Sequence, residues 1–145
     1  MREALNQARI AEHHGEVPVG AVLVKDGVVI GCGASSQIES NDPSAHAEVT
    51  ALRDAGQCTG NYRLIDSTLY VTLEPCMMCV GLMVHARIAR LVYGCAALKT
   101  GVVHTHGELL KWSSHNHRVE VTRGVLADEC SALLTAFFER QRRGS

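Results

Sequence analysis

Two short motifs bring together side chains that are common in metal sites. The first is His-Ala-Glu at residues 46–48, and the second is Pro-Cys-Met-Met-Cys at residues 75–79. Histidine and cysteine are usual ligands of Zn²⁺, and three such ligands leave the fourth tetrahedral position open, as in catalytic zinc sites. A lone histidine is usually only a satisfied polar residue, and a lone C-x-x-C serves either zinc or thiol redox chemistry. Their combination favours zinc, so we predict that His46, Cys76 and Cys79 bind one Zn²⁺ per chain.

Glu48 adds a carboxylate to this predicted site. It lies two residues after His46, so it can approach the activated water without competing as a ligand. A bound Zn²⁺ lowers the pKa of water toward neutrality. A nearby carboxylate can take a proton from that water and deliver it to a leaving nitrogen. A structural zinc site needs no such group and normally recruits a fourth protein ligand, so we predict a hydrolytic centre with Glu48 as the catalytic proton shuttle.

Both motifs fall at the predicted start of a helix. Ser44 can cap a helix over residues 45–55 that Gly56 ends. Pro75 suits the first turn of a second helix over residues 76–86, because its missing N–H has no partner there. Helix N-termini stabilise thiolates electrostatically, which suits metal-binding cysteines. A sheet must hold these two helix starts side by side.

Helices and strands alternate along the rest of the chain. Residues 2–14 predict an amphipathic helix, and β-branched runs at 19–24 and 28–31 predict a hairpin. The remaining predictions are a polar loop at 34–43, strands at 68–72, 89–93 and 119–122, a loop at 94–106, a helical turn near Leu109 and Leu110, and a helix at 128–142. This order predicts an α/β fold in which helices cover both faces of a mixed sheet.

Composition is typical of one globular domain. The chain has 145 residues, of which 46% are hydrophobic and 20% charged, so a disordered chain is excluded. This length predicts a single domain over residues 1–145. No apolar stretch approaches the ~20 residues of a membrane span, and we expect no membrane partner. No secretory signal is visible, so we expect a reducing, cytoplasmic location. Four isolated cysteines are then predicted to pack in the core: Cys32, Cys58, Cys95 and Cys130.

Charge is divided unevenly although the net charge is only −1. Residues 1–72 carry five Lys or Arg against nine Asp or Glu, and residues 73–145 carry nine against six. A basic second half permits a polyanionic partner without requiring one. The candidates for phosphate contacts are Arg87, Arg118, Arg123, Arg140, Arg142 and Arg143, and the candidates for base stacking are Tyr62, Trp112, Phe137 and Phe138.

The pairing of H-x-E with P-C-x-x-C matches the signature of zinc nucleobase deaminases. Longer segments resemble the bacterial tRNA-specific adenosine deaminases, at residues 16–24, 42–48, 61–66, 69–76, 99–101, 116–120 and 126–130. The resemblance implies a three-layer α/β/α cytidine-deaminase-like fold with a five-stranded mixed sheet, a homodimer, and conversion of adenosine to inosine at the tRNA wobble position. It also implies that zinc binds to His46, Cys76 and Cys79, and that Glu48 donates the proton. The substrate contacts that it implies are Pro18, Ser35, Asp42, Ala47, Pro75 and Ala97.

Two positions depart from the usual family pattern. The family usually has an asparagine that contacts the flipped base where this chain has Ser35, and commonly an aspartate where it has Ala97. Serine offers fewer hydrogen bonds than asparagine, on a shorter stem. Loss of the aspartate removes a charge beside the bound strand. These changes leave open an alternative function as a single-stranded DNA deaminase with relaxed or switched choice between adenine and cytosine, of natural or engineered origin.

Two further function classes are compatible with the motifs. A deaminase of free bases or nucleosides shares both motifs, and a nucleoside assay separates it from a polynucleotide enzyme. A zinc-stabilised scaffold or inactive subunit is the non-enzymatic alternative, and Glu48 argues against it. A polynucleotide enzyme must extrude its target base, which costs least in an unpaired loop. We therefore expect the partner to be a tRNA anticodon loop or another single-stranded nucleic acid.

Overall fold

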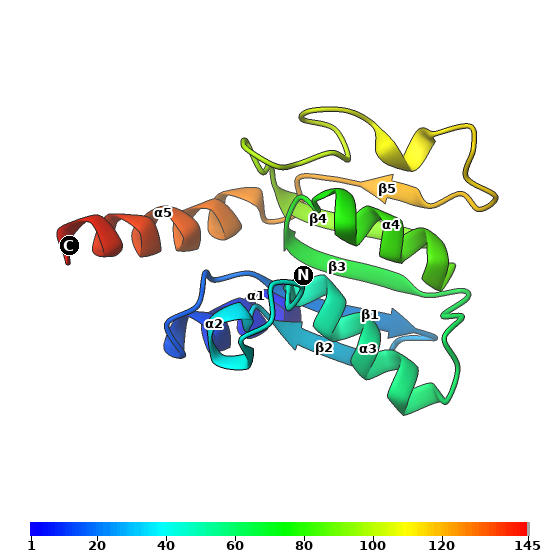
Figure 1. Ribbon diagram of the computed structural model, residues 1–145, viewed down its shortest axis with the longest axis horizontal. Coiled ribbons are helices and arrows are strands. Elements are labelled where there is room, and N and C mark those ends of the chain that lie inside the picture. The colour runs from blue at the N-terminus through cyan, green and yellow to red at the C-terminus, as the bar shows by residue number, and fades with distance from the viewer. Residues whose placement is uncertain (145) are drawn as a thin grey trace.

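The computed structural model describes residues 1–144, which form a five-stranded sheet with helices on both faces (Figure 1). The strands are β1 (Gly20–Lys25), β2 (Val28–Ala34), β3 (Thr68–Leu73), β4 (Arg90–Cys95) and β5 (Glu120–Thr122), in the order β2-β1-β3-β4-β5. β1 is antiparallel to β2 and β3, whereas β3, β4 and β5 run parallel. The predicted five-stranded mixed sheet is confirmed. The predicted domain extends to Ser145, which lies outside the described residues.

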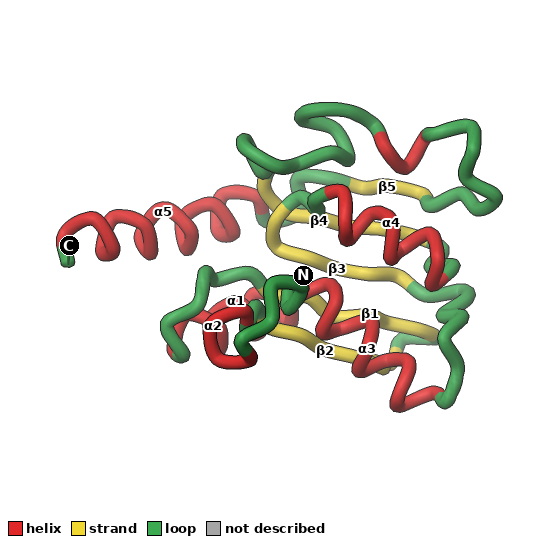
Figure 2. The backbone as a smooth tube through the Cα atoms, in the orientation of Figure 1, coloured by secondary structure: helices red, strands yellow, loops and turns green. Residues whose placement is uncertain are grey.

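The helices make two outer layers (Figures 1 and 2). They are α1 (Arg2–His13), α2 (Gln37–Ser40), α3 (Ala47–Thr59), α4 (Met77–Ala86) and α5 (Ala127–Arg143), with a 3₁₀ turn η1 (Leu109–Lys111). α3 and α4 lie side by side on one face of the sheet, and α1 and the start of α5 lie on the other. This arrangement confirms the three-layer α/β/α architecture. No helix in the described chain is long and apolar enough to cross a membrane.

Local sequence explains how α3, which carries the first motif, is held on the sheet. Asp26 and Gly27 have φ angles of 51° and 75°, the left-handed pair that a tight type I′ hairpin needs between β1 and β2. β2 then approaches α3 closely, because a Cβ at Gly33 would lie 2.4 Å from the carbonyl oxygen of Ala47. A side chain at this position would therefore push away the helix that begins beside His46.

Some predicted boundaries around the first motif are wrong. α3 continues past Gly56 and ends before Gly60, whose φ of 68° gives the left-handed conformation of a helix C-cap. Ser44 does not cap α3, because its hydroxyl donates to Asp42 at 2.7 Å and the N-cap residue is His46. The predicted loop at 34–43 contains the short helix α2.

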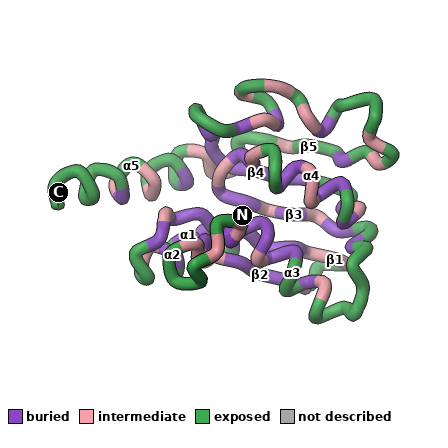
Figure 3. The backbone as a smooth tube through the Cα atoms, in the orientation of Figure 1, coloured by how far each residue is buried: buried purple, intermediate pink, exposed green. Residues whose placement is uncertain are grey.

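Burial separates the four isolated cysteines into two pairs. Cys95 and Cys130 are buried between β4 and α5, as predicted. Cys32 and Cys58 are exposed, so their predicted core positions are wrong. Cys32 lies on the edge strand β2, and Cys58 lies in the last turn of α3. Figure 3 shows buried residues along the sheet and the facing sides of the helices, whereas the far half of α5 is mostly exposed.

Candidate active site

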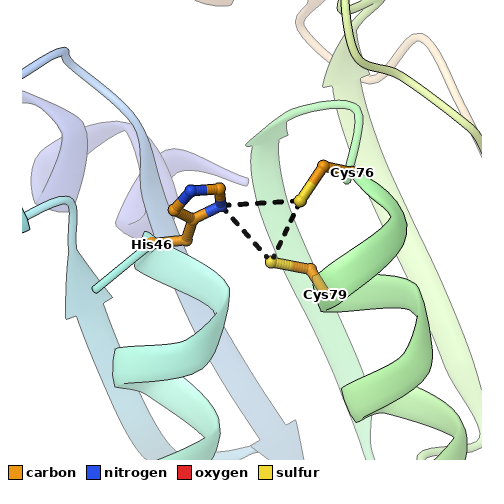
Figure 4. Close-up of side chains that lie close together, drawn as sticks. All are labelled: His46, Cys76 and Cys79. Carbon is orange, nitrogen blue, oxygen red and sulfur yellow. Dashed lines mark hydrogen bonds between the residues drawn. The ribbon is translucent and has the colours of Figure 1, made fainter. Parts of the chain in front are cut away.

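The two motifs meet at the N-terminal ends of α3 and α4 (Figure 4). His46 is the N-cap residue of α3, Cys76 is the N-cap residue of α4, and Cys79 lies in the first turn of α4. One chain connection and one packing contact bring the motifs together. β3 leads directly into α4, and α3 packs on the neighbouring strands β1 and β2. The sheet therefore holds both helix starts at the same end, as the sequence predicts.

The spacing of the three donor atoms fits a tetrahedral zinc ion. Nδ1 of His46 lies 3.6 Å from Sγ of Cys76 and from Sγ of Cys79, and the two sulfur atoms are 3.9 Å apart. Zn–S bonds of about 2.3 Å and Zn–N bonds of about 2.0–2.1 Å at tetrahedral angles put such pairs about 3.6 Å and 3.8 Å apart. Within the described chain, this is the one group of three or more His, Cys, Asp or Glu side chains close enough to share an ion.

The electrostatics of this group also suit a metal. The pKa of Cys76 is lowered to about 3, because its sulfur accepts hydrogen bonds from the Cys79 thiol, the His46 ring and the backbone N–H groups of Cys79 and Met78. The pKa of Cys79 is raised, because its thiol donates to Cys76 and is buried. Metal ions bind the thiolate form of cysteine, so the lowered pKa of Cys76 suits a metal ligand.

The buried carboxyl of Glu48 lies at the same site as His46 and Cys76. It lies in the first turn of α3, is 4% exposed and lines the cavity that also contains His46 and Cys76. Burial raises the pKa of Glu48, because the carboxylate loses its water. A carboxyl of raised pKa can both accept and release a proton at ordinary pH, which is the property that a proton shuttle needs.

A cavity of about 150 Å³ is lined in part by His46 and Cys76. Five chain segments line it: the residues before β1, the residues from the end of β2 to the start of α2, the start of α3, the chain from the end of β3 into α4, and the loop after β4. The lining residues are Val17, Val19, Ser35, Gln37, His46, Glu48, Leu73, Glu74, Cys76 and Thr100. Larger hollows of about 650 Å³ and 390 Å³ lie elsewhere, and none of His46, Cys76 and Cys79 lines them. The smaller cavity is therefore the candidate site, because the chemistry-bearing groups face it.

Five of the six predicted substrate contacts lie in or beside the lining of this cavity, and Asp42 is not among the lining residues. Ser35 lines it directly. Pro18, Ala47, Pro75 and Ala97 are buried beside lining residues. Asp42 accepts hydrogen bonds from the Ser44 N–H and hydroxyl, which hold the pKa of Asp42 below its usual value. These contacts stay predictions.

The candidate phosphate-binding arginines are partly engaged within the protein. The guanidinium groups of Arg87 and Arg118 donate to backbone carbonyls of the loop between η1 and β5, and Arg140 pairs with Glu12 at 2.6 Å. Among the candidate stacking residues, Phe137 is buried. The others, Tyr62, Trp112 and Phe138, are exposed.

Sequence reasoning missed two buried glutamates, Glu16 and Glu74, of which Glu74 lines the cavity. Glu16 accepts hydrogen bonds from the N–H groups of Ile38 and Glu39, at 3.1 Å and 2.9 Å, and so fixes the start of α2. Glu74, at the end of β3, accepts five hydrogen bonds from the loop after β4. Burial alone would raise the pKa of Glu74, but these hydrogen bonds lower it. The available signal was a charged residue directly after the apolar run of β3.

Comparison with known proteins gives a consistent picture. The family model described as MafB19-like deaminase matches residues 1–142. The tRNA-specific adenosine deaminase of Haemophilus influenzae is 51% identical over 143 residues, which cover 98% of this chain and 83% of that protein. The tRNA-specific adenosine deaminase of Buchnera aphidicola subsp. Baizongia pistaciae is 47% identical over 144 residues, which cover 99% of this chain and 88% of that protein.

A solved structure agrees with these relatives. It comes from biochemical and structural studies of A-to-I editing by tRNA:A34 deaminases at the wobble position of transfer RNA, and its TM-score is 0.89. The match has 41% sequence identity and covers 92% of this chain and 97% of that chain. Bacterial proteins thus match nearly the whole sequence, and an engineered origin gains no support from them.

Proposed function

This chain belongs to the MafB19-like deaminase family and to the tRNA-specific adenosine deaminases within the cytidine-deaminase-like fold, and we propose that it converts adenosine to inosine at the wobble position of tRNA anticodons. One observation carries the proposal: three donor atoms with the spacing of a tetrahedral zinc site lie beside the buried carboxyl of Glu48. A redox C-x-x-C would need neither His46 nor Glu48.

The proposed reaction replaces the amino group of adenine by oxygen. His46, Cys76 and Cys79 would hold Zn²⁺, which when bound supplies Lewis-acid activation of the attacking water. The Glu48 carboxylate accepts a proton from that water and delivers it to the departing nitrogen. The new C–O bond forms at the ring carbon that carried the amino group, its C–N bond breaks, and ammonia leaves.

The cavity supports a single extruded base as substrate. Its volume of about 150 Å³ leaves no room for a stacked neighbour. Val17, Val19 and Leu73 offer apolar surface to the ring faces, and Ser35 and Gln37 offer polar groups to its edge. Unpaired bases cost least to extrude, so an anticodon loop suits this cavity better than a duplex.

A panel of four substrates tests this assignment. We expect inosine in an RNA anticodon stem-loop with adenosine at the wobble position, at a rate at least about tenfold above that of the matching DNA loop or of either loop with cytosine. Mass spectrometry of the digested nucleosides measures all four reactions. Free adenosine and guanine serve as controls for a nucleoside or free-base deaminase.

Ser35 provides the observation that favours a second candidate function. It lines the cavity where the family usually has asparagine, so deamination of single-stranded DNA or of cytosine stays the alternative. Comparable rates on RNA and DNA loops would support this alternative and contradict RNA specificity. In that case Ser35→Asn should reduce the reaction on the added substrates more than the reaction on RNA adenosine.

We also propose that the chain forms a homodimer through the outer face of α4. Its sequence is apolar almost all round, and such helices are normally buried. Met77 at its start is nevertheless 69% exposed, and an apolar groove of about 230 Å³ runs between α3 and α4. Gly81 leaves open space on this face, since a Cβ there would meet no atom within 4 Å. A second copy of α4 would cover this surface.

Light scattering after size exclusion tests the dimer. Gly81→Arg places a charge on the outer face of α4 without a clash inside one chain, so we expect a folded monomer whose melting temperature does not depend on protein concentration. Ile10→Arg on the exposed side of α1 is the matched control and should stay dimeric. A wild-type monomer at micromolar concentration, or a dimeric Gly81→Arg protein, would rule out this interface.

A further inference from the structure

The buried carboxylate of Glu74 accepts hydrogen bonds from both ends of the loop after β4. Glu74 is 2% exposed. Its Oε2 accepts hydrogen bonds from the N–H groups of Val103, His104 and Thr105, at 3.1, 2.8 and 2.9 Å. Its Oε1 accepts a hydrogen bond from the N–H of Ala97 at 3.2 Å and another from the hydroxyl of Thr105. Residues 97–105, the clamped loop, therefore wrap around a single side chain.

The clamped loop can close over Glu74 because residue 101 is glycine. A Cβ at Gly101 would lie 2.4 Å from Cδ and Oε1 of Glu74, and 2.7 Å from the carbonyl oxygen of Ala97. Real Cβ contacts are not that short, so any side chain at this position would force the loop and the carboxylate apart. Within the loop, the N–H of Gly101 donates to the carbonyl of Ala97 at 2.9 Å. Glu74 and Gly101 are therefore the two partners of a single close contact.

The clamped loop is also a wall of the candidate active site. Thr100 lines the cavity together with Glu74 and Cys76. The N–H of Val102 donates to the carbonyl of Pro75 at 3.2 Å, which ties the loop to the residue before the first cysteine ligand. A loop without these contacts would have to become ordered when substrate binds, at a cost in conformational entropy.

The hydrogen bonds also indicate what Glu74 does not do. A carboxylate has about four lone-pair positions, and five donors from the clamped loop already surround this one. No acceptor position is left for a substrate proton. Glu48, which has no such set of donors, remains the group for proton transfer.

We propose that Glu74 is a positioning residue that fixes the clamped loop as a preformed wall of the substrate cavity. This proposal rests on the proposed deaminase function and adds a residue that acts through the loop rather than on the reacting atoms. Its loss should weaken the binding of substrate and transition state equally, which raises KM and leaves kcat nearly unchanged.

Two variants break the same contact from opposite sides. Glu74→Gln keeps the size of the side chain but turns an NH₂ group toward N–H donors, and Gly101→Ala leaves the carboxylate intact and displaces the loop. For each we expect KM on the RNA stem-loop to rise about tenfold or more, with kcat within about threefold and zinc content unchanged. KM of the double variant should exceed that of either single variant by no more than about twofold, because both substitutions remove the same interaction.

Hydrogen exchange and a matched control separate positioning from stability. Backbone amides 103–105 should lose protection in Glu74→Gln. Ser67→Ala removes a buried hydroxyl at the opposite end of β3, where it donates to the carbonyl of Leu64. It should lower the melting temperature and leave KM unchanged.

Two different failures are distinguishable. An active wild-type enzyme whose Glu74→Gln and Gly101→Ala variants melt earlier but keep KM within about twofold would reduce Glu74 to a stabilising residue. A zinc-loaded wild type that deaminates no RNA loop would overturn the proposed function, and with it the role of Glu74 in that reaction.

Discussion

Glu48→Gln is expected to lower the rate of deamination between about a hundredfold and ten-thousandfold, the range that general acid–base catalysis supplies. The variant keeps the shape of a side chain that is 4% exposed, so the cavity should survive. An amide cannot accept the proton of the attacking water or return it to the leaving nitrogen. Initial rates on the RNA stem-loop, read by mass spectrometry, measure the loss.

The zinc content separates this effect from damage to the metal site. Glu48 is not one of the three donors whose atoms cluster within 4.8 Å, so Glu48→Gln should keep one zinc ion per chain and a melting temperature close to that of wild type. A variant that retains more than about a tenth of the wild-type rate would show that another group moves the proton.

Cys76→Ala is expected to remove both the metal and the activity. Two ligands remain after this change. The substitution removes Sγ of Cys76, the atom that lies 3.6 Å from Nδ1 of His46 and 3.9 Å from Sγ of Cys79 in the arrangement that fits a tetrahedral ion. We expect zinc to fall from one ion to less than about a tenth of an ion per purified chain, and activity to fall to background. Elemental analysis gives the first number and the stem-loop assay the second.

The exposed cysteines provide the control for this experiment. Cys32→Ser and Cys58→Ser change thiols that lie outside the metal group, so both should keep zinc and activity. Chelation of the wild type should abolish activity, and added Zn²⁺ should restore it in the wild type but not in Cys76→Ala. Full zinc occupancy in Cys76→Ala would contradict the ligand assignment.

The meeting of His46, Cys76 and Cys79 could be predicted because it depends on local sequence. C-x-x-C places two thiols on one helical turn, and the apolar run before it indicates where that helix begins. Pro75, which was predicted to lie in the first turn, instead lies just before the N-cap residue Cys76. His46 was expected beside the two thiols because both motifs start helices at one end of a sheet. The hairpin at Asp26-Gly27 could also be predicted from the sequence, because these residues tolerate positive φ angles.

The errors arose where tertiary contacts override local preference. Gly56 resembles a helix end, but α3 continues to Thr59, and the backbone turns left-handed only at the C-cap residue Gly60. Ser44 resembles an N-cap, but its hydroxyl is used by Asp42. Glu74 was missed because its partners lie 23 to 31 residues further along the chain, and no spacing rule connects a strand end with a loop that returns to it.

The central claim is that this chain performs zinc-dependent hydrolysis of one adenosine in an RNA loop. The most direct test is nucleoside analysis of a tRNA whose anticodon begins with adenosine, after incubation with the zinc-loaded protein. We predict inosine at that position with the wild type and adenosine with Glu48→Gln. Unchanged adenosine after incubation with fully zinc-loaded wild type would contradict the claim.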